Sequence, residues 1–131
     1  MQTSRLQHVK VIALPIVDAE RAAKFYETVL GLKPAYEGGK QVGYYLGEII
    51  LMLKSNWYAC PTQNPNPRIT IETDDAVQME RQLRESGVII SDSIEVYDEF
   101  YVGSFLDSEG NKLWYCAPVK SGAEAANKGA P

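Results

Sequence analysis

The sequence predicts an α+β fold of two βαβββ modules, and an internal repeat is the main reason for this prediction. Residues 9–17 are apolar and rich in β-branched side chains, as in a buried strand, and an amphipathic stretch follows between Asp18 and Gly31. Asp74 and Gly87 repeat this spacing of 13 residues after a second apolar stretch. The 56 residues between the copies accommodate a strand, a helix and about three further short strands. The same architecture is therefore expected twice.

The first module is expected to span residues 8–54. Its first strand, residues 9–17, ends at Asp18, whose carboxylate is suited to accept hydrogen bonds from the free amides of a first helical turn. The helix should end at Gly31, because glycine readily takes the left-handed conformation that closes a helix. Three strands then follow, over residues 35–37, 41–46 and 48–54, with a hairpin turn around Gly47.

Residues 55–67 contain three prolines and are expected to link the modules. The second module, residues 68–118, should begin with a strand over 69–73, a cap at Asp74–Asp75 and a helix over 76–86. Its remaining strands are expected over residues 88–90, 91–99 with a turn, 100–106 and 112–117. Together, residues 1–118 are interpreted as a single domain, and residues 119–131 as a disordered tail without large apolar side chains.

Composition excludes several classes of partner. Hydrophobic residues make up 45% and charged residues 23% of the 131 residues, which is typical of a soluble globular domain. The formal net charge of −4 offers nothing to a polyanion, so neither nucleic acid nor an acidic membrane surface is an expected partner. No apolar run approaches membrane-spanning length and no signal-peptide pattern is found, so a cytoplasmic location is expected. Cys60 and Cys116 are interpreted as free thiols.

Two signatures connect the chain to a known family. They are VD-x-x-RA-x-x-FY-x-x-VLG over Val17–Gly31 and F-x-D-x-x-GN over Phe105–Asn111. Together with the repeat, they resemble the vicinal oxygen chelate superfamily, which includes glyoxalases, bleomycin resistance proteins and extradiol dioxygenases. The resemblance implies that each module curls into a half-open sheet and that both line a cup-shaped mixed sheet with helices outside. It also implies a homodimer that acts on a small molecule.

The same resemblance implies four positions where metal-dependent members carry ligands. Here these positions hold Val11, Met52, Arg68 and Trp114. Valine and tryptophan offer no lone pair to a divalent ion, a thioether is a poor ligand for hard ions, and a guanidinium repels a cation. We therefore expect no catalytic metal in the cup and no other cofactor.

Without a metal, the expected cup is an aromatic and aliphatic hollow with a few polar groups. Strand alternation places Thr70 and Glu72 on the same face as Arg68, and three aromatic side chains are expected at its border. The predicted ligand-binding residues are Arg68, Trp114, Met52, Thr70, Glu72, Trp57, Tyr44 and Tyr101. Two structural alternatives stay open: Trp114 only fills a core, or Glu72 only pairs with Arg68.

These observations favour a metal-free protein that binds a partly aromatic small molecule in the cup, as bleomycin resistance proteins do. The net negative charge and the aromatic lining suit a cationic or aromatic ligand. The alternative is a lyase, isomerase or dioxygenase of the same superfamily with a non-standard active site, because this fold supports many reactions. A third hypothesis is a scaffold that acts through protein contacts.

Overall fold

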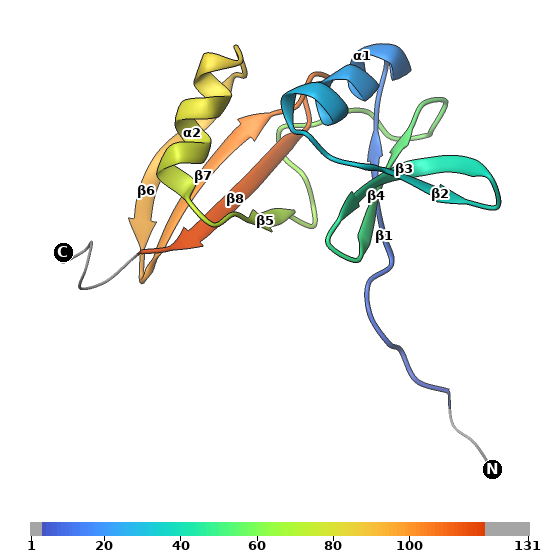
Figure 1. Cartoon of the computed structure of the whole chain (residues 1–131), viewed down its shortest axis with the longest axis horizontal. Helices are drawn as coiled ribbons and strands as arrows, with labels where there is room; N and C mark the ends of the chain where they lie inside the picture. Colours follow the sequence, from blue (N-terminus) through green and yellow to red (C-terminus); the bar gives the residue numbers. More distant parts are fainter. Residues whose placement is uncertain (1–3, 120–131) are drawn as a thin grey trace. The chain divides into compact units, whose positions relative to one another are not determined.

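A computed structural model describes residues 4–119 of the chain, which divides into two compact units between Pro61 and Thr62. We call the part up to Pro61 unit 1 and the part from Thr62 onward unit 2, and describe each by itself. The boundary falls inside the predicted linker, residues 55–67. Each unit contains one four-stranded mixed sheet and one helical segment (Figure 1). The α+β class and the two βαβββ modules are confirmed.

Unit 1 has the strand order β1-β4-β3-β2 in its sheet. Strand β1 pairs parallel with β4, and the other two pairs are antiparallel. The elements are β1 (Val11–Pro15), α1 (Ala19–Lys24), the π-helix η1 (Phe25–Val29), β2 (Pro34–Glu37), β3 (Lys40–Leu46) and β4 (Ile49–Lys54).

The helical segment of unit 1 begins and ends where the sequence predicts. Asp18 caps it, because its carboxylate accepts a hydrogen bond of 3.0 Å from the backbone amide of Arg21. Gly31 follows its end with φ at +69°. The wider π turns of η1 were not predicted, and Leu30 N–H donates to the Phe25 carbonyl across one of them. The buried ring of Tyr26 stacks against Tyr44 of the sheet, with 6.0 Å between ring centroids.

Unit 2 repeats this arrangement with the strand order β5-β8-β7-β6. Strand β5 pairs parallel with β8, and the other two pairs are antiparallel. The elements are β5 (Thr70–Glu72), α2 (Ala76–Glu85), β6 (Ile90–Tyr97), β7 (Phe100–Leu106) and β8 (Lys112–Pro118). Asp75 caps α2 by accepting a hydrogen bond of 3.0 Å from the Gln78 amide, and Gly87 follows with φ at +79°.

Strand β6 differs from the prediction of a short strand over 88–90 followed by a polar strand over 91–99. The structure has one strand, Ile90–Tyr97, with register shifts between Ile90 and Asp92 and again between Asp92 and Glu95. The polar run Ser91–Ser93 lies at these irregularities and interrupts the alternation of apolar and polar residues, so the sequence pattern does not indicate one continuous strand.

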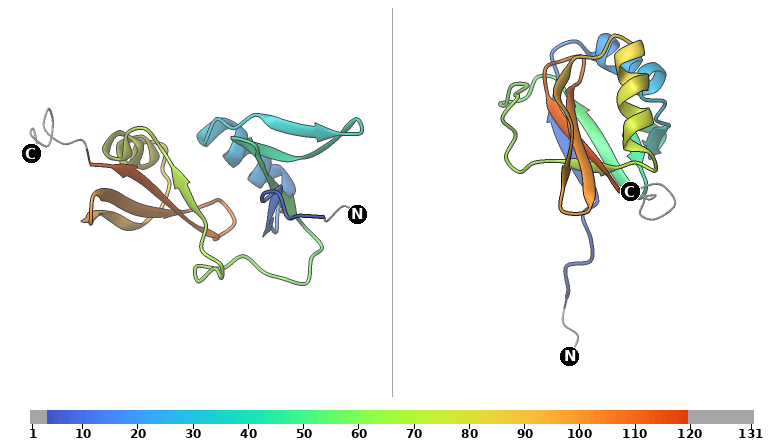
Figure 2. Two further views of the ribbon diagram at one scale, coloured as in Figure 1. Left: turned by 90° about the horizontal axis from the view of Figure 1, so that it is seen from below. Right: turned by 90° about the vertical axis from the view of Figure 1, so that its left-hand side faces the viewer.

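Helix α2 covers one face of the unit 2 sheet (Figure 2). Alternate residues of β7 and β8 on that face are buried, among them Phe105, Leu113, Tyr115 and Ala117. The intervening residues of β8, including Trp114 and Cys116, lie on the opposite face, which we call the open face of unit 2. They are half-buried rather than buried. The candidate site lies on this open face.

At the carboxyl end of β8, Val119 donates its N–H to the Glu99 carbonyl at 2.9 Å. The rest of the predicted disordered tail lies outside the described residues. Between residues 4 and 119, none of the helices has the length and hydropathy needed to cross a membrane.

Candidate functional site

The open face of unit 2 brings together four of the predicted ligand-binding residues. Register pairs Thr70 of β5 with Trp114 of β8, and Glu72 with Cys116, so these side chains share one face of the sheet. Arg68 lies two residues before Thr70 and reaches the same place. Its guanidinium carbon lies 4.0 Å from the centroid of the Trp114 ring.

A second cation contacts the same ring. The Lys112 ammonium nitrogen lies 4.5 Å from the Trp114 ring centroid. Lys112 precedes Trp114 by two residues on β8 and therefore points to the same face. Trp114 is thus a half-buried aromatic side chain that two positive side chains contact. Filling a core does not by itself account for these contacts.

Lys112 is itself held by a carboxylate. Its ammonium nitrogen lies 2.7 Å from an oxygen of Asp92 on β6, and the Ser104 hydroxyl donates to the same oxygen at 2.6 Å. Hydrogen bonds from Lys112 and then Ser104 hold the pKa of the Asp92 carboxyl below its ordinary value of 3.8. The ion pair keeps the positive charge of Lys112 compensated.

Lys112, Asp92 and Ser104 are absent from the sequence-based prediction. The signal for Lys112 was available, since strand alternation places it on the face of Trp114. Asp92 and Ser104 face one another across β6 and β7, and the register shifts in β6 hide that pairing from the sequence.

Glu72 lies at the other end of the open face, beside Cys116. Within residues 4–119 it forms no ion pair with Arg68, so the structural alternative for these two residues is not what the structure shows. Burial raises the pKa of the Cys116 thiol, and the negative charge of Glu72 raises it further. Cys60 and Cys116 are both free thiols, as predicted.

The two tyrosines of the prediction lie elsewhere. Tyr44 faces the helical segment of unit 1, where its hydroxyl donates to Glu27 at 2.9 Å, and burial followed by this hydrogen bond raises its pKa. Tyr101 lies on the helix-covered side of unit 2, where it lines a cavity of about 370 Å³ with the first turns of α2. The structure therefore does not bring Tyr101 to the open face with Trp114.

Met52 and Trp57 belong to unit 1. Met52 is half-buried on β4 and pairs with Ala13 of β1, so it lies on the face of that sheet away from Tyr44. Trp57 follows β4 in the linker, edge-to-face with Tyr58 at 5.0 Å between centroids, and the Lys54 ammonium lies 5.8 Å from its ring.

The four positions that the resemblance assigns to metal ligands do not fit a metal. Val11 and Trp114 provide no donor atom, and the guanidinium of Arg68 already covers the Trp114 ring. In the part of the chain that the structure describes, no three side chains of His, Cys, Asp or Glu gather to hold an ion. The residues present therefore cannot supply the donor set that such a site needs.

Comparisons with known proteins agree on the fold. The family model described as Glyoxalase/Bleomycin resistance protein/Dioxygenase superfamily matches residues 5–115. A comparison with curated proteins finds no match. Among solved structures, TnmS3, an antibiotic binding protein from Streptomyces sp. CB03234, is 22% identical with a TM-score of 0.70, covering 88% of this chain and 99% of that one.

Two further solved structures illustrate the range of similar proteins. A lactoylglutathione lyase from Agrobacterium tumefaciens is 17% identical with a TM-score of 0.67, covering 87% of this chain and 96% of that one. A superfamily member from Sphaerobacter thermophilus DSM 20745 is 19% identical with a TM-score of 0.71, covering 86% and 98%. At these identities the similarity shows the fold alone.

Proposed function

Because the chain belongs to the Glyoxalase/Bleomycin resistance protein/Dioxygenase superfamily, we propose that it is a metal-free small-molecule-binding protein of this type. Its ligand is a partly aromatic small molecule that contacts the open face of unit 2. The observation that supports this most is the half-buried Trp114 ring, which Arg68 and Lys112 contact on the face that α2 leaves uncovered.

The chemistry of the open face suits such a ligand. An indole ring offers a large flat surface, and a hydroxyl from Thr70 and a carboxylate from Glu72 stand at neighbouring positions of the sheet. Binding sites for small molecules combine an apolar or aromatic wall with a few polar groups that fix orientation. We also propose that Met52 and Trp57 of unit 1 contact a ligand.

A protein of similar fold supports this proposal. TnmS3, whose fold is similar, is named as an antibiotic binding protein, so the fold accommodates binding of a small molecule. The side chains at the four positions expected to hold a metal support binding of the small molecule without a metal, since the affinity for an ion depends on which side chains coordinate it.

An enzyme of the same superfamily, a lyase, isomerase or dioxygenase with a non-standard active site, is the second candidate. The similar lactoylglutathione lyase from Agrobacterium tumefaciens is the observation that favours it. On the open face, Glu72 is the group suited to transfer a proton, and turnover that survives Glu72→Gln unchanged would argue against this version.

A thermal-shift titration tests the binding proposal. The protein is dialysed against EDTA and heated with planar aromatic compounds, and a ligand at 100 times its Kd should stabilise it by about 2.7 kcal/mol and raise Tm by several degrees. Trp114→Leu should lose the ligand-induced shift while retaining a cooperative transition of its own. If no compound raises Tm of the native sequence, the binding proposal is wrong.

The proposal extends to the assembly and the location of the protein. We propose a homodimer in the cytoplasm, with neither nucleic acid nor membrane as a partner. Light scattering after size-exclusion chromatography should give twice the 14.6 kDa of one chain. A mass of one chain at micromolar concentration would contradict the dimer.

A further inference from the structure

Positive charge at the Trp114 ring is only partly compensated. Lys112 pairs with Asp92 at 2.7 Å, and Asp92 also accepts a hydrogen bond from Ser104, so the carboxylate is engaged twice. Arg68 forms neither an ion pair nor a side-chain hydrogen bond with any residue from 4 to 119. Its contact is with the face of the Trp114 ring. The charge of Arg68 also acts on the Asp92 carboxylate, as the weakest of the causes that lower its pKa, so Arg68 and Lys112 share one carboxylate and the ring keeps a net positive surrounding.

A guanidinium that contacts an aromatic ring keeps its hydrogen-bond donors. Five N–H groups lie in the guanidinium plane, and a cation–π contact does not consume them. Arg68 is exposed, so these donors are accessible from outside the protein. Their fork matches the two oxygens of a carboxylate, and such charge-assisted pairs are among the stronger hydrogen bonds.

The same arrangement disfavours a cationic ligand at this ring. The negative faces of an indole ring attract cations, and here Arg68 at 4.0 Å and Lys112 at 4.5 Å from the Trp114 ring centroid already make these contacts. Glu72 lies two residues beyond Thr70 along β5. By strand geometry its backbone is about 7 Å further from Arg68 than the backbone of Thr70 is. The open face is therefore positive at the Trp114 end and negative at the Cys116 end.

We propose that the open face of unit 2 selects a planar aromatic ligand that carries an anionic group, with the anion on Arg68 and the ring beside Trp114. This inference rests on the proposed function and adds the charge of the ligand. It replaces the cationic ligand that the net charge of −4 suggests, because the local charge at the ring is opposite to that of the whole chain.

Three probes that share one ring system test the charge preference. They are 2-naphthoate, 2-naphthalenemethanol and 2-naphthylmethylammonium, titrated into the EDTA-dialysed full-length protein at low ionic strength by calorimetry. The anion should bind at least about fivefold more tightly than the neutral alcohol, and the cation most weakly. The preference should fall as salt is added, because Arg68 is exposed.

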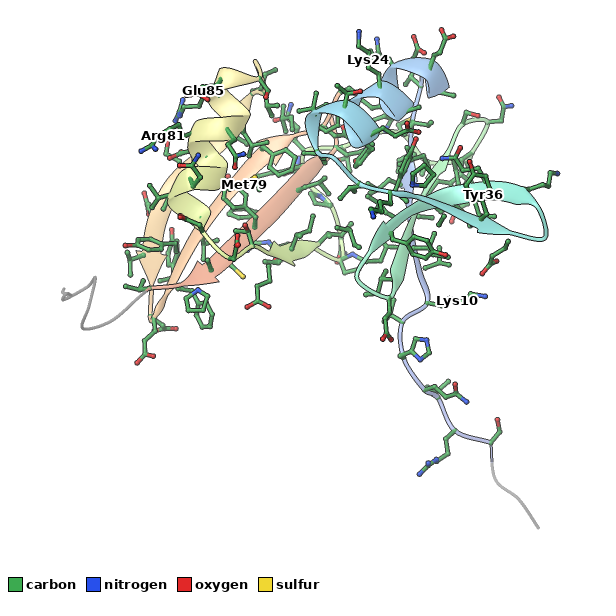
Figure 3. All side chains as sticks on the ribbon, in the orientation of Figure 1. Lys10, Lys24, Tyr36, Met79, Arg81 and Glu85 are labelled. Carbon is green, nitrogen blue, oxygen red and sulfur yellow. The ribbon has the colours of Figure 1, made fainter. Side chains whose placement is uncertain are left out.

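Substitutions assign this preference to one side chain. Arg68→Gln should bring the affinity for 2-naphthoate down to that for the alcohol, and Arg68→Lys should retain part of the difference. The matched control is Arg81→Gln, which removes the same charge from α2, where Arg81 is exposed and donates to Gln78 (Figure 3). The control should keep the preference for the anion.

Each of the other outcomes contradicts a specific part of the proposal. If the alcohol or the cation binds as tightly as the anion, the charge inference is wrong and the binding proposal stands. If Arg81→Gln reduces the preference as much as Arg68→Gln, the effect comes from net charge and the assignment to Arg68 is wrong. If none of the three probes binds, the binding proposal itself fails.

Discussion

Two buried tyrosines differ in what their hydroxyl groups contact. The Tyr44 hydroxyl donates to Glu27 at 2.9 Å. The Tyr115 hydroxyl is buried and has no hydrogen-bond partner in the described part of the chain. Burial, and then the charge of Glu80, raise the pKa of Tyr115 to about 12. A buried polar group without a partner loses its bonds to water and gains nothing in return.

Removing each hydroxyl should therefore have opposite effects. Tyr115→Phe is expected to raise the free energy of unfolding by about 1 kcal/mol, and Tyr44→Phe to lower it by about the same amount. Urea denaturation followed by circular dichroism measures both. Destabilisation by Tyr115→Phe equal to that by Tyr44→Phe would mean that the Tyr115 hydroxyl has a partner in solution.

Asp92 should make stability depend on pH in the acid range. Its pKa is lowered by Lys112 and Ser104, so its contribution is fully present above the ordinary value of 3.8 and is lost as the pH falls through the lowered folded-state value. The difference in unfolding free energy between the native sequence and Asp92→Asn should be constant from pH 7 to about pH 5 and shrink at lower pH. A difference that does not vary down to pH 2.5 would contradict the ion pair.

For single residues, the sequence predicts the types of side chain in the candidate site better than it predicts the face of the sheet on which each side chain lies. Tyr44 and Tyr45 are adjacent, so one of them must lie on each face, and composition does not decide which. Pairing of Tyr44 with Leu51, both buried, places Tyr44 toward the helix. Thr70, Glu72 and Trp114 were placed on one face correctly, because a strand start and a turn fix their register.

Helix caps set the limits of both helical segments. Asp18 and Asp75 each accept from the backbone amide three residues later, at 3.0 Å in both cases. These bonds satisfy amides that the helix itself leaves free. The spacing to Gly31 and Gly87 is therefore a local feature of the sequence, which explains why these boundaries were predictable.

The two neighbouring aspartates before α2 allow a matched test. Asp75→Ala should lower the free energy of unfolding by about 1 kcal/mol, because it removes the cap. Asp74→Ala removes the same charge one residue earlier and should cost clearly less, since within residues 4–119 the Asp74 carboxylate accepts a hydrogen bond only from the Thr73 hydroxyl, at 3.4 Å. Thermal or urea unfolding compares the variants, and equal losses would show that charge rather than capping is responsible.

Elements with less local information were predicted less well. Strand β6 was divided in two, because its register shifts interrupt the alternation from which strands are recognised. The π turns of η1 had no sequence signal at all, since the apolar stripe suits an α-helix equally well. The irregular register of β6 is set by its pairing with β7, and η1 packs through Tyr26 against Tyr44 of the sheet, so neither feature can be read from the element's own residues.

Across the whole molecule, the repeat and two signatures were enough to predict the family, which the match over residues 5–115 confirms. The ligand charge that we propose could not be inferred from the global charge. The net charge of −4 suggests a cation, whereas our proposal of an anion rests on the contacts of Trp114 with Arg68 and Lys112. These contacts depend on the fold and are not visible in the composition.

The most direct test of the account is an NMR titration of the EDTA-dialysed, ¹⁵N-labelled protein with 2-naphthoate. The chain has two tryptophans, so two indole N–H signals are expected, and Trp114→Phe identifies one of them by its loss. The account predicts a saturable shift of the Trp114 signal without any metal, with the same Kd after Zn²⁺ is added. A Trp114 signal that does not move, or that moves only once a divalent metal is present, would contradict it.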